Sequence, residues 1–439
     1  MKKLYSVTLM MLAAALIVAG CGSKSDNSST ESASPHNSAS SSASASQPAS
    51  GEKVSISFWT LNQGWEWVEP AIADFEAANP NIKVELTKYE VDPIKEALKV
   101  AASSKTLPDI WFTWGGTLGS FYPENGMTMD LTQTAKEHQW SEIYNKAAID
   151  MSTYGGKVSG IPVHLNVLGM WYPKSVYEKL SLKAPTTFAE FESQLQALKD
   201  AGVTPMAFGS KGGWHTMRLT EQLIETFGGA ELHDKLNSLE ASWNDPAVVK
   251  TFEKLKEYTD KGYFPKGYVS LDPTEAENLI YTETAGLINE GTWFDGVIAG
   301  QGFDNKKFGV FKFPNDQKPS RASVFAEMFQ INGASDPAKQ AAAVKFGEYL
   351  TSADVVNKYI EQYGSPATLK VTLSPNTPHL KEMLDSANDG GFLITDQALP
   401  QEVAQKLFEA QDKVALNEWT PQQAAEAMQK AAEAYKSKK

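Results

Sequence analysis

Two kinds of hydrophobic periodicity alternate between residues 54 and 113, and this alternation constrains the fold more than any other feature. Residues 54–60 and 82–89 carry apolar side chains at alternate positions, the period of a strand. In residues 66–79 and 93–104 the apolar side chains lie three or four positions apart, the period of an amphipathic helix. A short apolar run at 108–113 follows. Strands joined by helices pair in parallel with right-handed crossovers, so the pattern predicts an α/β fold with a parallel sheet.

The part of the chain that folds is too long for one hydrophobic core. It begins near Glu52 and leaves about 390 residues, so we predict two lobes. Periodicity predicts more helices and strands after residue 174. The helices are expected at 188–201, 217–227, 246–261, 273–284, 337–351, 353–362 and 400–437, and the strands at 205–208, 285–289, 308–313 and 324–331.

The segment 154–174 has the features of a strand between two parts of the fold. It opens on a Gly155-Gly156 turn, and Pro162 favours extended geometry in the residue before it. His164 and Asn166 then alternate with apolar residues. One interpretation is a strand that crosses between the lobes with its polar face toward a ligand cleft. The alternative is an ordinary amphipathic strand at a sheet edge.

The N-terminus has the pattern of a bacterial lipoprotein signal. Lys2 and Lys3 precede an apolar run at 9–18, which is too short to span a membrane and ends before Cys21. We predict that residues 1–20 are removed and that Cys21 carries lipid. The lipid anchors the protein to the outer face of the cell membrane without spanning it. Cys21 is the only cysteine, so the chain has no possibility of a disulfide framework.

Residues 21–51 are dominated by Ser, Ala, Asn and Thr. Such a segment cannot bury enough apolar surface to offset the entropy of ordering it. We expect a disordered tether that lets the folded part stand away from the membrane. The net charge of −13 argues against nucleic acid or anionic lipid as the main partner.

Motifs for catalysis, metals and cofactors are mostly absent. The chain lacks a Gly-x-Ser-x-Gly elbow, a phosphate loop and a His-Glu-x-x-His pair, and its histidines are scattered. A faint calcium-loop pattern at 385–390 has Ala387 at its third position and is discarded. No cofactor or metal is therefore predicted. A pair of carboxylates for glycoside hydrolysis stays open, because only their separation in space identifies it.

Tryptophans recur just after predicted strand ends, often beside glycine. An indole can cover the apolar face of a sugar ring, while amides and carboxylates bond its hydroxyl groups. Each tryptophan alone is better explained by core packing, but five of them near turns shift the balance toward a carbohydrate cleft. The five with this placement are Trp59, Trp65, Trp114, Trp214 and Trp293. We interpret Trp111, Trp140, Trp243 and Trp419 as packing residues.

Five segments, together with the lipoprotein signal and the Ser-rich tether, resemble one family. They read PDIWFTWGG, YGGKVSGIP, GMWYPKSVYEK, GLINEGTW and FAEMFQINGAS. Their order and spacing resemble the extracellular solute-binding proteins of family 1, the maltose and oligosaccharide-binding type. This resemblance implies the type II periplasmic-binding fold, in which crossing hinge segments join two α/β lobes around a ligand cleft. The implied lobes are 52–163 with 312–352, and 164–311 with 353–439.

The resemblance also implies ligand contacts, residue by residue. They are Asn62, Gln63 and Trp65 after the first strand, Trp114 after the third, Asn166 and then His164 on the crossing strand, Trp214 and His215 in a loop, and Trp293 with Asp295. The chain departs from the family at Tyr172-Pro173-Lys174, where the family has Tyr-Asn-Lys. It also has Glu327, where the family has a small residue. Glu327 is expected either to reach a sugar hydroxyl, which we favour, or to form a salt bridge.

The implied function is the substrate-binding component of an ABC importer. The protein is expected to be a monomer that closes on a carbohydrate and delivers it to the transmembrane permease, with no bond broken. The clustered tryptophans favour an oligosaccharide. A lipid-anchored hydrolase or lyase is the alternative from another class, and a sugar-sensing receptor subunit is a third possibility.

Overall fold

The computed structural model describes residues 53–438. The predicted signal peptide, Cys21 and the predicted tether lie outside the described residues. Among residues 53–438, no helix is both long and apolar enough to cross a bilayer.

The first third of the described chain folds as the periodicity predicts. β1 (Val54–Leu61), β2 (Ile82–Tyr89) and β3 (Ile110–Trp114) are joined by α1 (Val68–Ala78) and α2 (Val91–Ser104). Both β2 and β3 pair with β1 in parallel, so the prediction of a parallel arrangement is confirmed for these strands. Alternate side chains of β1 are buried, which is why its sequence shows the period of a half-buried strand.

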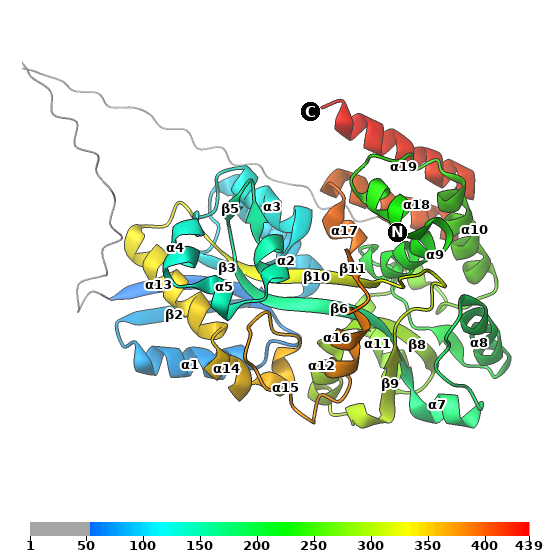
Figure 1. The fold of residues 1–439 in the computed structure, drawn as a ribbon, viewed down its shortest axis with the longest axis horizontal. Helices are drawn as coiled ribbons and strands as arrows, with labels where there is room; N and C mark the ends of the chain where they lie inside the picture. The colour runs from blue at the N-terminus through cyan, green and yellow to red at the C-terminus, as the bar shows by residue number, and fades with distance from the viewer. Residues whose placement is uncertain (1–52, 439) are drawn as a thin grey trace, which may run out of the picture. The chain divides into compact units, whose positions relative to one another are not determined.

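The predicted crossing strand is β6 (Ile161–Pro173), and two groups of strands share it. Its first half pairs antiparallel with β10 (Ala322–Ile331), which in turn pairs antiparallel with β3. Its second half pairs with β8 (Ala285–Gly291) and β9 (Phe308–Phe311). Figure 1 shows β6 and β10 running side by side through the middle of the fold. An edge-strand interpretation of residues 154–174 is therefore wrong, because β6 has neighbours on both sides.

The complete sheet is mixed. Its order is β2-β1-β3-β10-β6-β8-β7, with β7 (Thr204–Met206) parallel to β8 and β11 (Gly391–Leu393) parallel to β10. A separate two-stranded sheet pairs β4 (Thr153–Tyr154) with β5 (Lys157–Val158).

Helices flank the sheet and fill its connections. In chain order they are α3 (Gly116–Glu124), α4 (Thr132–Glu137), α5 (Trp140–Ile143), α6 (Lys146–Met151), α7 (Lys174–Lys179), α8 (Phe188–Asp200), α9 (Trp214–Asn237), α10 (Pro246–Asp260), α11 (Pro273–Tyr281), α12 (Phe294–Gly300), α13 (Pro337–Leu350), α14 (Ala353–Lys358), α15 (Ile360–Tyr363), α16 (Leu380–Ser386), α17 (Thr395–Ala398), α18 (Gln401–Ala415) and α19 (Pro421–Lys436). Two expected helices are divided in the structure: the segment 353–362 breaks at Tyr359, and the segment 400–437 breaks between α18 and α19.

Three helices begin with the same local signal, an aspartate followed by proline. The side chains of Asp245, Asp272 and Asp336 accept a backbone N–H in the first turns of α10, α11 and α13. The proline after each has no N–H to leave unsatisfied and has its φ already set for a helix. The cap at Asp272 fixes the start of α11, the helix that carries Glu277.

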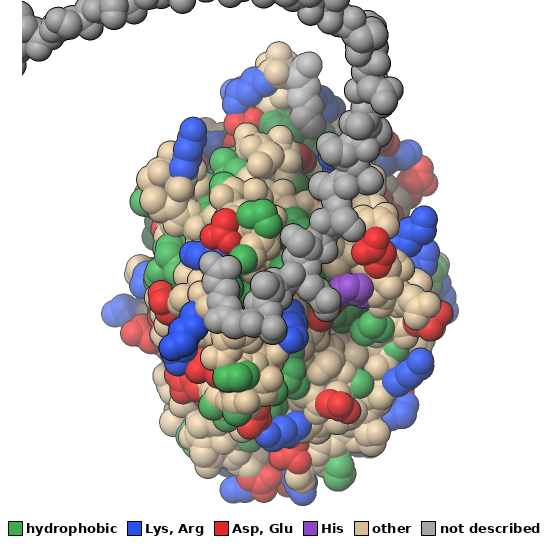
Figure 2. Space-filling view, turned by 90° about the vertical axis from the view of Figure 1, so that its left-hand side faces the viewer, with side chains coloured by type: hydrophobic (Ala, Val, Ile, Leu, Met, Phe, Trp, Pro, Cys, Tyr) green, Lys and Arg blue, Asp and Glu red, His purple; other side chains and the backbone are tan. Residues whose placement is uncertain are grey.

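The core contains most of the tryptophans predicted to pack. Trp111, Trp140 and Trp243 are fully buried. Trp59 departs from the predicted cleft position, because its ring lies against Tyr89 with 5.1 Å between ring centroids and it does not line the cavity described below. On the face shown in Figure 2, acidic and basic side chains are interspersed and no field of one sign forms.

Candidate ligand-binding cavity

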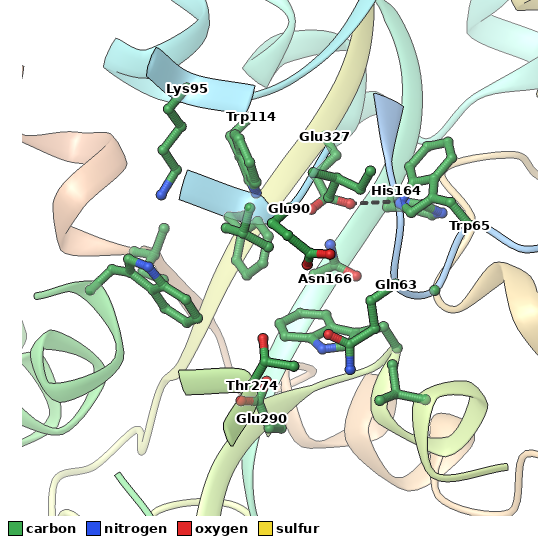
Figure 3. Close-up of a pocket in the computed structure, with 18 of the residues that line it drawn as sticks. Gln63, Trp65, Glu90, Lys95, Trp114, His164, Asn166, Thr274, Glu290 and Glu327 are labelled. Carbon is green, nitrogen blue, oxygen red and sulfur yellow. Dashed lines mark hydrogen bonds and ion pairs between the residues drawn. The ribbon is translucent and has the colours of Figure 1, made fainter. Parts of the chain in front are cut away.

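A cavity lies beyond the carboxyl ends of the first three strands. The last residues of these strands, Leu61, Tyr89 and Trp114, all line it. Its empty space, including the open mouth, is about 1080 Å³. Residues of β6, β8, β10, α2 and α11 also line it (Figure 3). Further lining residues come from α3, α9, α12, α15 and α17. Ligands of α/β proteins bind beyond the carboxyl ends of strands, and this cavity has that position.

Most of the residues predicted to bind ligand meet around this cavity. They are Gln63, Trp65, Trp114, His164, Asn166, Trp214, Trp293 and Glu327. Their contact with ligand stays a prediction, but their convergence from distant parts of the sequence is a property of the structure.

Three other predicted residues do not line the cavity. The Asn62 amide donates to Glu90 Oε1 over 3.0 Å instead. His215 is fully buried, and its ring stacks on that of Trp214. Successive helical residues point about 100° apart, so Trp214 faces the cavity and His215 does not. Asp295 is buried and its carboxylate accepts the backbone N–H of His379 and a bond from that residue's Nδ1, at 3.0 and 2.7 Å.

Three indoles form part of the aromatic surface of the cavity. Trp114 ends β3, Trp214 begins α9, and Trp293 follows β8. The ring of Trp293 lies over Gly291, where a Cβ of any other residue would come within 1.9 Å of it, so only glycine permits this position. Trp65 is less available, because it is 4% exposed and packs on Trp67.

Two cations lie against these indoles. The Arg218 guanidinium is 4.7 Å from the ring centroid of Trp214 and 5.4 Å from that of Trp293. The Lys95 ammonium lies 5.1 Å from the centroid of Trp114 and 5.6 Å from that of Trp214. Cation–π attraction at these distances fixes the orientation of the rings before any ligand arrives.

Arg218 also neutralises a buried carboxylate. Its Nη1 donates to Glu290 Oε2 over 3.0 Å and to the carbonyl of Asn289 over 2.8 Å. Burial raises the pKa of Glu290, and the neighbouring Arg218 opposes that rise. Burial, with Arg218 nearby, lowers the pKa of His215 well below its ordinary value, so this imidazole stays neutral beside Glu290.

A hydrogen bond joins the loop after β1 to helix α11. Gln63 Nε2 donates to Glu277 Oε2 over 2.9 Å, and the Tyr281 hydroxyl donates to the same oxygen over 2.7 Å. Burial, followed by the proximity of Glu290, raises the pKa of Glu277 to about 8. Its protonated form is therefore favoured more than that of an ordinary glutamate.

The polar face of β6 meets β10 at the cavity floor. His164 Nδ1 and Glu327 Oε2 are 2.6 Å apart, the pair marked in Figure 3. Glu327 thus forms the expected salt-bridge contact and also lines the cavity. Asn166 Oδ1 accepts from the Thr292 hydroxyl over 2.9 Å. Asn166 Nδ2 and His164 Nε2 are shielded from solvent and have no partner among residues 53–438, and both residues line the cavity.

Several charged lining residues were not predicted from the sequence. They are Glu90, Lys95, Arg218, Glu277, Glu290 and Asp396. Glu290 could have been found, because it comes directly before the Gly-x-Trp turn at the end of a buried strand. In the part of the chain that the structure describes, no group of three or more His, Cys, Asp or Glu residues is placed to hold a metal ion.

Glu277→Gln is expected to stabilise the protein at alkaline pH. The pKa of Glu277 is about 8 when folded and near 4.5 when unfolded, so the wild type loses stability as pH rises between these values. Glutamine keeps an acceptor for Gln63 and cannot ionise. We expect the variant's melting temperature to exceed that of the wild type by several degrees at pH 9 and to match it at pH 4.5. Glu275→Gln, on the exposed side of the same helix, is the control, and an equal shift at both pH values would contradict the assignment.

A cavity at the ends of strands, lined by indoles and polar side chains, is typical of a protein that binds a small ligand. Residues 70–384 match the family model of bacterial extracellular solute-binding proteins, and the chain belongs to this family. The prediction of a solute-binding protein, rather than an enzyme, is therefore confirmed. An extracellular family also agrees with the predicted extracytoplasmic location.

Curated relatives are similar at moderate identity. The chain is 27% identical to the multiple sugar-binding protein of Streptococcus mutans over 348 residues, which cover 74% of this chain and 78% of that protein. It is 33% identical to an uncharacterized ABC transporter extracellular-binding protein of Pyrococcus horikoshii over 229 residues, 51% of this chain. The second match spans only about half of that relative, 53% of its length.

Solved structures confirm the type II periplasmic-binding fold. A chitin oligosaccharide binding protein superposes with a TM-score of 0.79 at 23% identity, covering 87% of this chain and 99% of that one. The maltose/maltodextrin-binding domain of Bdellovibrio bacteriovorus, bound to maltotriose, has a TM-score of 0.73 at 22% identity, with the same two coverages.

Proposed function

We propose that the protein captures an oligosaccharide and delivers it to an ABC permease. The observation that carries this proposal is the meeting of Trp114, Trp214 and Trp293 around one cavity that also holds free polar atoms. Indoles cover the apolar faces of sugar rings, and amide and carboxylate groups bond their edges. Three indoles on different elements suit a ligand of more than one ring.

The names of related proteins support a carbohydrate ligand and an importer. The S. mutans relative is a multiple sugar-binding protein, and a galactooligosaccharide-binding protein of Bacillus subtilis is 21% identical over 381 residues. The P. horikoshii relative is named as an ABC transporter component. We extend the ligand class and the permease partner from these proteins to this chain.

Closure of two lobes is the proposed mechanism. We assign 52–163 with 312–352 to one lobe and 164–311 with 353–439 to the other. A ligand held by both lobes favours the closed form by its differential affinity for that form. Among the bonds that cross this proposed boundary, those from Gln63 to Glu277 at 2.9 Å and from Trp214 Nε1 to Asp92 Oδ1 at 3.2 Å support contact between the lobes beside the cavity. We propose that the closed protein docks on the permease as a monomer.

The lipid anchor is a second part of the proposal, supported by the sequence around Cys21. Cys21→Ser is expected to remove the lipid-modified form from the membrane fraction, because serine cannot accept the thioether-linked lipid. Fractionation and mass spectrometry of the N-terminal peptide measure this. Ser23→Ala is the control, and an unchanged membrane fraction for Cys21→Ser would exclude the anchor.

A thermal-shift screen tests the function itself. Maltotriose, raffinose, chitotriose and galactotriose are compared with amino acids and polyols, and each mixture is then analysed for products. We expect a rise in melting temperature with at least one oligosaccharide, which is recovered unchanged. Shifts with non-sugar solutes only would overturn the carbohydrate class. Cleavage products would favour the hydrolase or lyase that the sequence left open.

A further inference from the structure

The short helix α17 brings two side chains to the cavity that no sequence pattern marked. Asp396 and Gln397 both line it. Figure 1 shows α17 between α3 and α9, and both helices contact it. Toward α9, the N–H of Thr395 donates to Glu221 Oε2 over 2.8 Å. Toward α3, the Thr117 hydroxyl donates to the carbonyl of Leu399 over 2.6 Å. Bonds on both sides therefore fix the position of this helix.

Each of the two side chains presents an unused acceptor. Asp396 Oδ1 and Gln397 Oε1 are shielded from solvent and have no hydrogen-bond partner within residues 53–438. The Gln397 residue is only 2% exposed, so its amide cannot turn outward to bulk water. Buried acceptors are usually paired, so an unpaired one in a residue that lines a cavity can be completed by a donor on a ligand.

The surroundings of Asp396 define the kind of donor. Burial raises the pKa of Asp396, while the positive charges of Lys95 and Arg218 and the backbone N–H groups of Asp396 and Gln397 oppose that rise. Both cations also line the cavity, and they partly balance the negative charge of Asp396. A carboxylate oxygen and an amide oxygen can only accept. Neutral hydroxyl groups are the donors that match both the charge and the hydrogen-bonding pattern.

We propose that Asp396 Oδ1 and Gln397 Oε1 form a hydroxyl-binding subsite that recognises a sugar unit with free hydroxyl groups. This inference rests on the proposed carbohydrate function and assigns two residues of α17 to sugar binding.

Gln397→Leu is the sharpest test, because leucine removes the acceptor and keeps most of the volume. We expect the dissociation constant for the oligosaccharide that most stabilises the wild type, among maltotriose, raffinose, chitotriose and galactotriose, to rise about 5- to 10-fold. The melting temperature of the ligand-free variant should stay equal or rise, since an unsatisfied buried group is lost. A residue with a purely structural role would lower that temperature and leave affinity unchanged. Gln405→Leu, the same change at an exposed position of α18, is the matched control.

Asp396→Asn is the second variant, which keeps the shape and removes the charge. We expect affinity for the same oligosaccharide to fall about 5-fold, because charged acceptors bond hydroxyls more strongly than neutral ones. Glu402→Gln, a carboxylate on α18 outside the cavity, is its control. If the wild type binds an oligosaccharide and both variants bind it equally well, only the subsite is overturned. If the wild type binds none of the four, the carbohydrate function fails, and the subsite fails with it.

Discussion

Trp293→Ala is expected to weaken oligosaccharide binding about 10- to 100-fold while the protein stays folded. The indole lies at the end of β8 over Gly291 and beside Arg218, so its position is fixed before binding. Its loss removes an apolar surface against which a sugar ring can stack. Isothermal titration gives the affinity, and a melting curve in the absence of sugar shows whether the fold survives.

The control for this variant is Trp419→Ala. Trp419 is partly buried, lies against Lys413 and does not line the cavity. Its variant should keep the wild-type affinity. Trp114→Ala, at the end of β3, should also lower the affinity for the oligosaccharide. Wild-type affinity in both cavity variants would show that the sugar does not stack at these positions.

Arg218→Met is expected to cause the largest loss of stability, about 3–5 kcal/mol at pH 8. Arg218 is the cation bonded to buried Glu290, and methionine leaves that carboxylate without a counter-charge. Burial already raises the pKa values of Glu290 and Glu277. Without Arg218 both rise further, so the folded variant holds protons that the unfolded chain releases. Its stability therefore falls as pH increases, and the loss should be smaller at pH 5.

Urea unfolding at pH 5 and pH 8 measures this difference. The double variant with Glu290→Gln should recover part of the loss at pH 8, because it removes the unpaired charge. A deficit of the same size at both pH values, with no recovery in the double variant, would mean that Arg218 acts through packing on the indoles alone.

The regular part of the fold could be predicted because its signal is local. β1 and β2 alternate between buried and more exposed positions over much of their length, and β3 is wholly buried. The two helices that join them, α1 and α2, are amphipathic. The break in the C-terminal tail also has a local signal, from which it could have been predicted. Thr420 and Gln423 form a capping box at the start of α19, with Pro421 between them.

The charged and polar residues of the cavity could not be predicted from hydrophobic periodicity. The first turns of α9 are buried on all sides, so Arg218 does not stand out as the polar face of an amphipathic helix. Glu277 is buried on α11, and its hydrogen-bond partner Gln63 lies 214 residues away in the sequence. Asp396 and Gln397 lie in a helix of four residues, which is too short to show a period. Tertiary contacts alone place these groups.

A crystal structure of the protein with the oligosaccharide that gives the largest thermal shift tests most directly whether this cavity holds a carbohydrate. We predict a sugar ring against the indole of Trp293, with a hydroxyl within hydrogen-bonding distance of Asn166 Nδ2. A sugar bound elsewhere on the protein, with Trp114, Trp214 and Trp293 free of contact, would contradict the account.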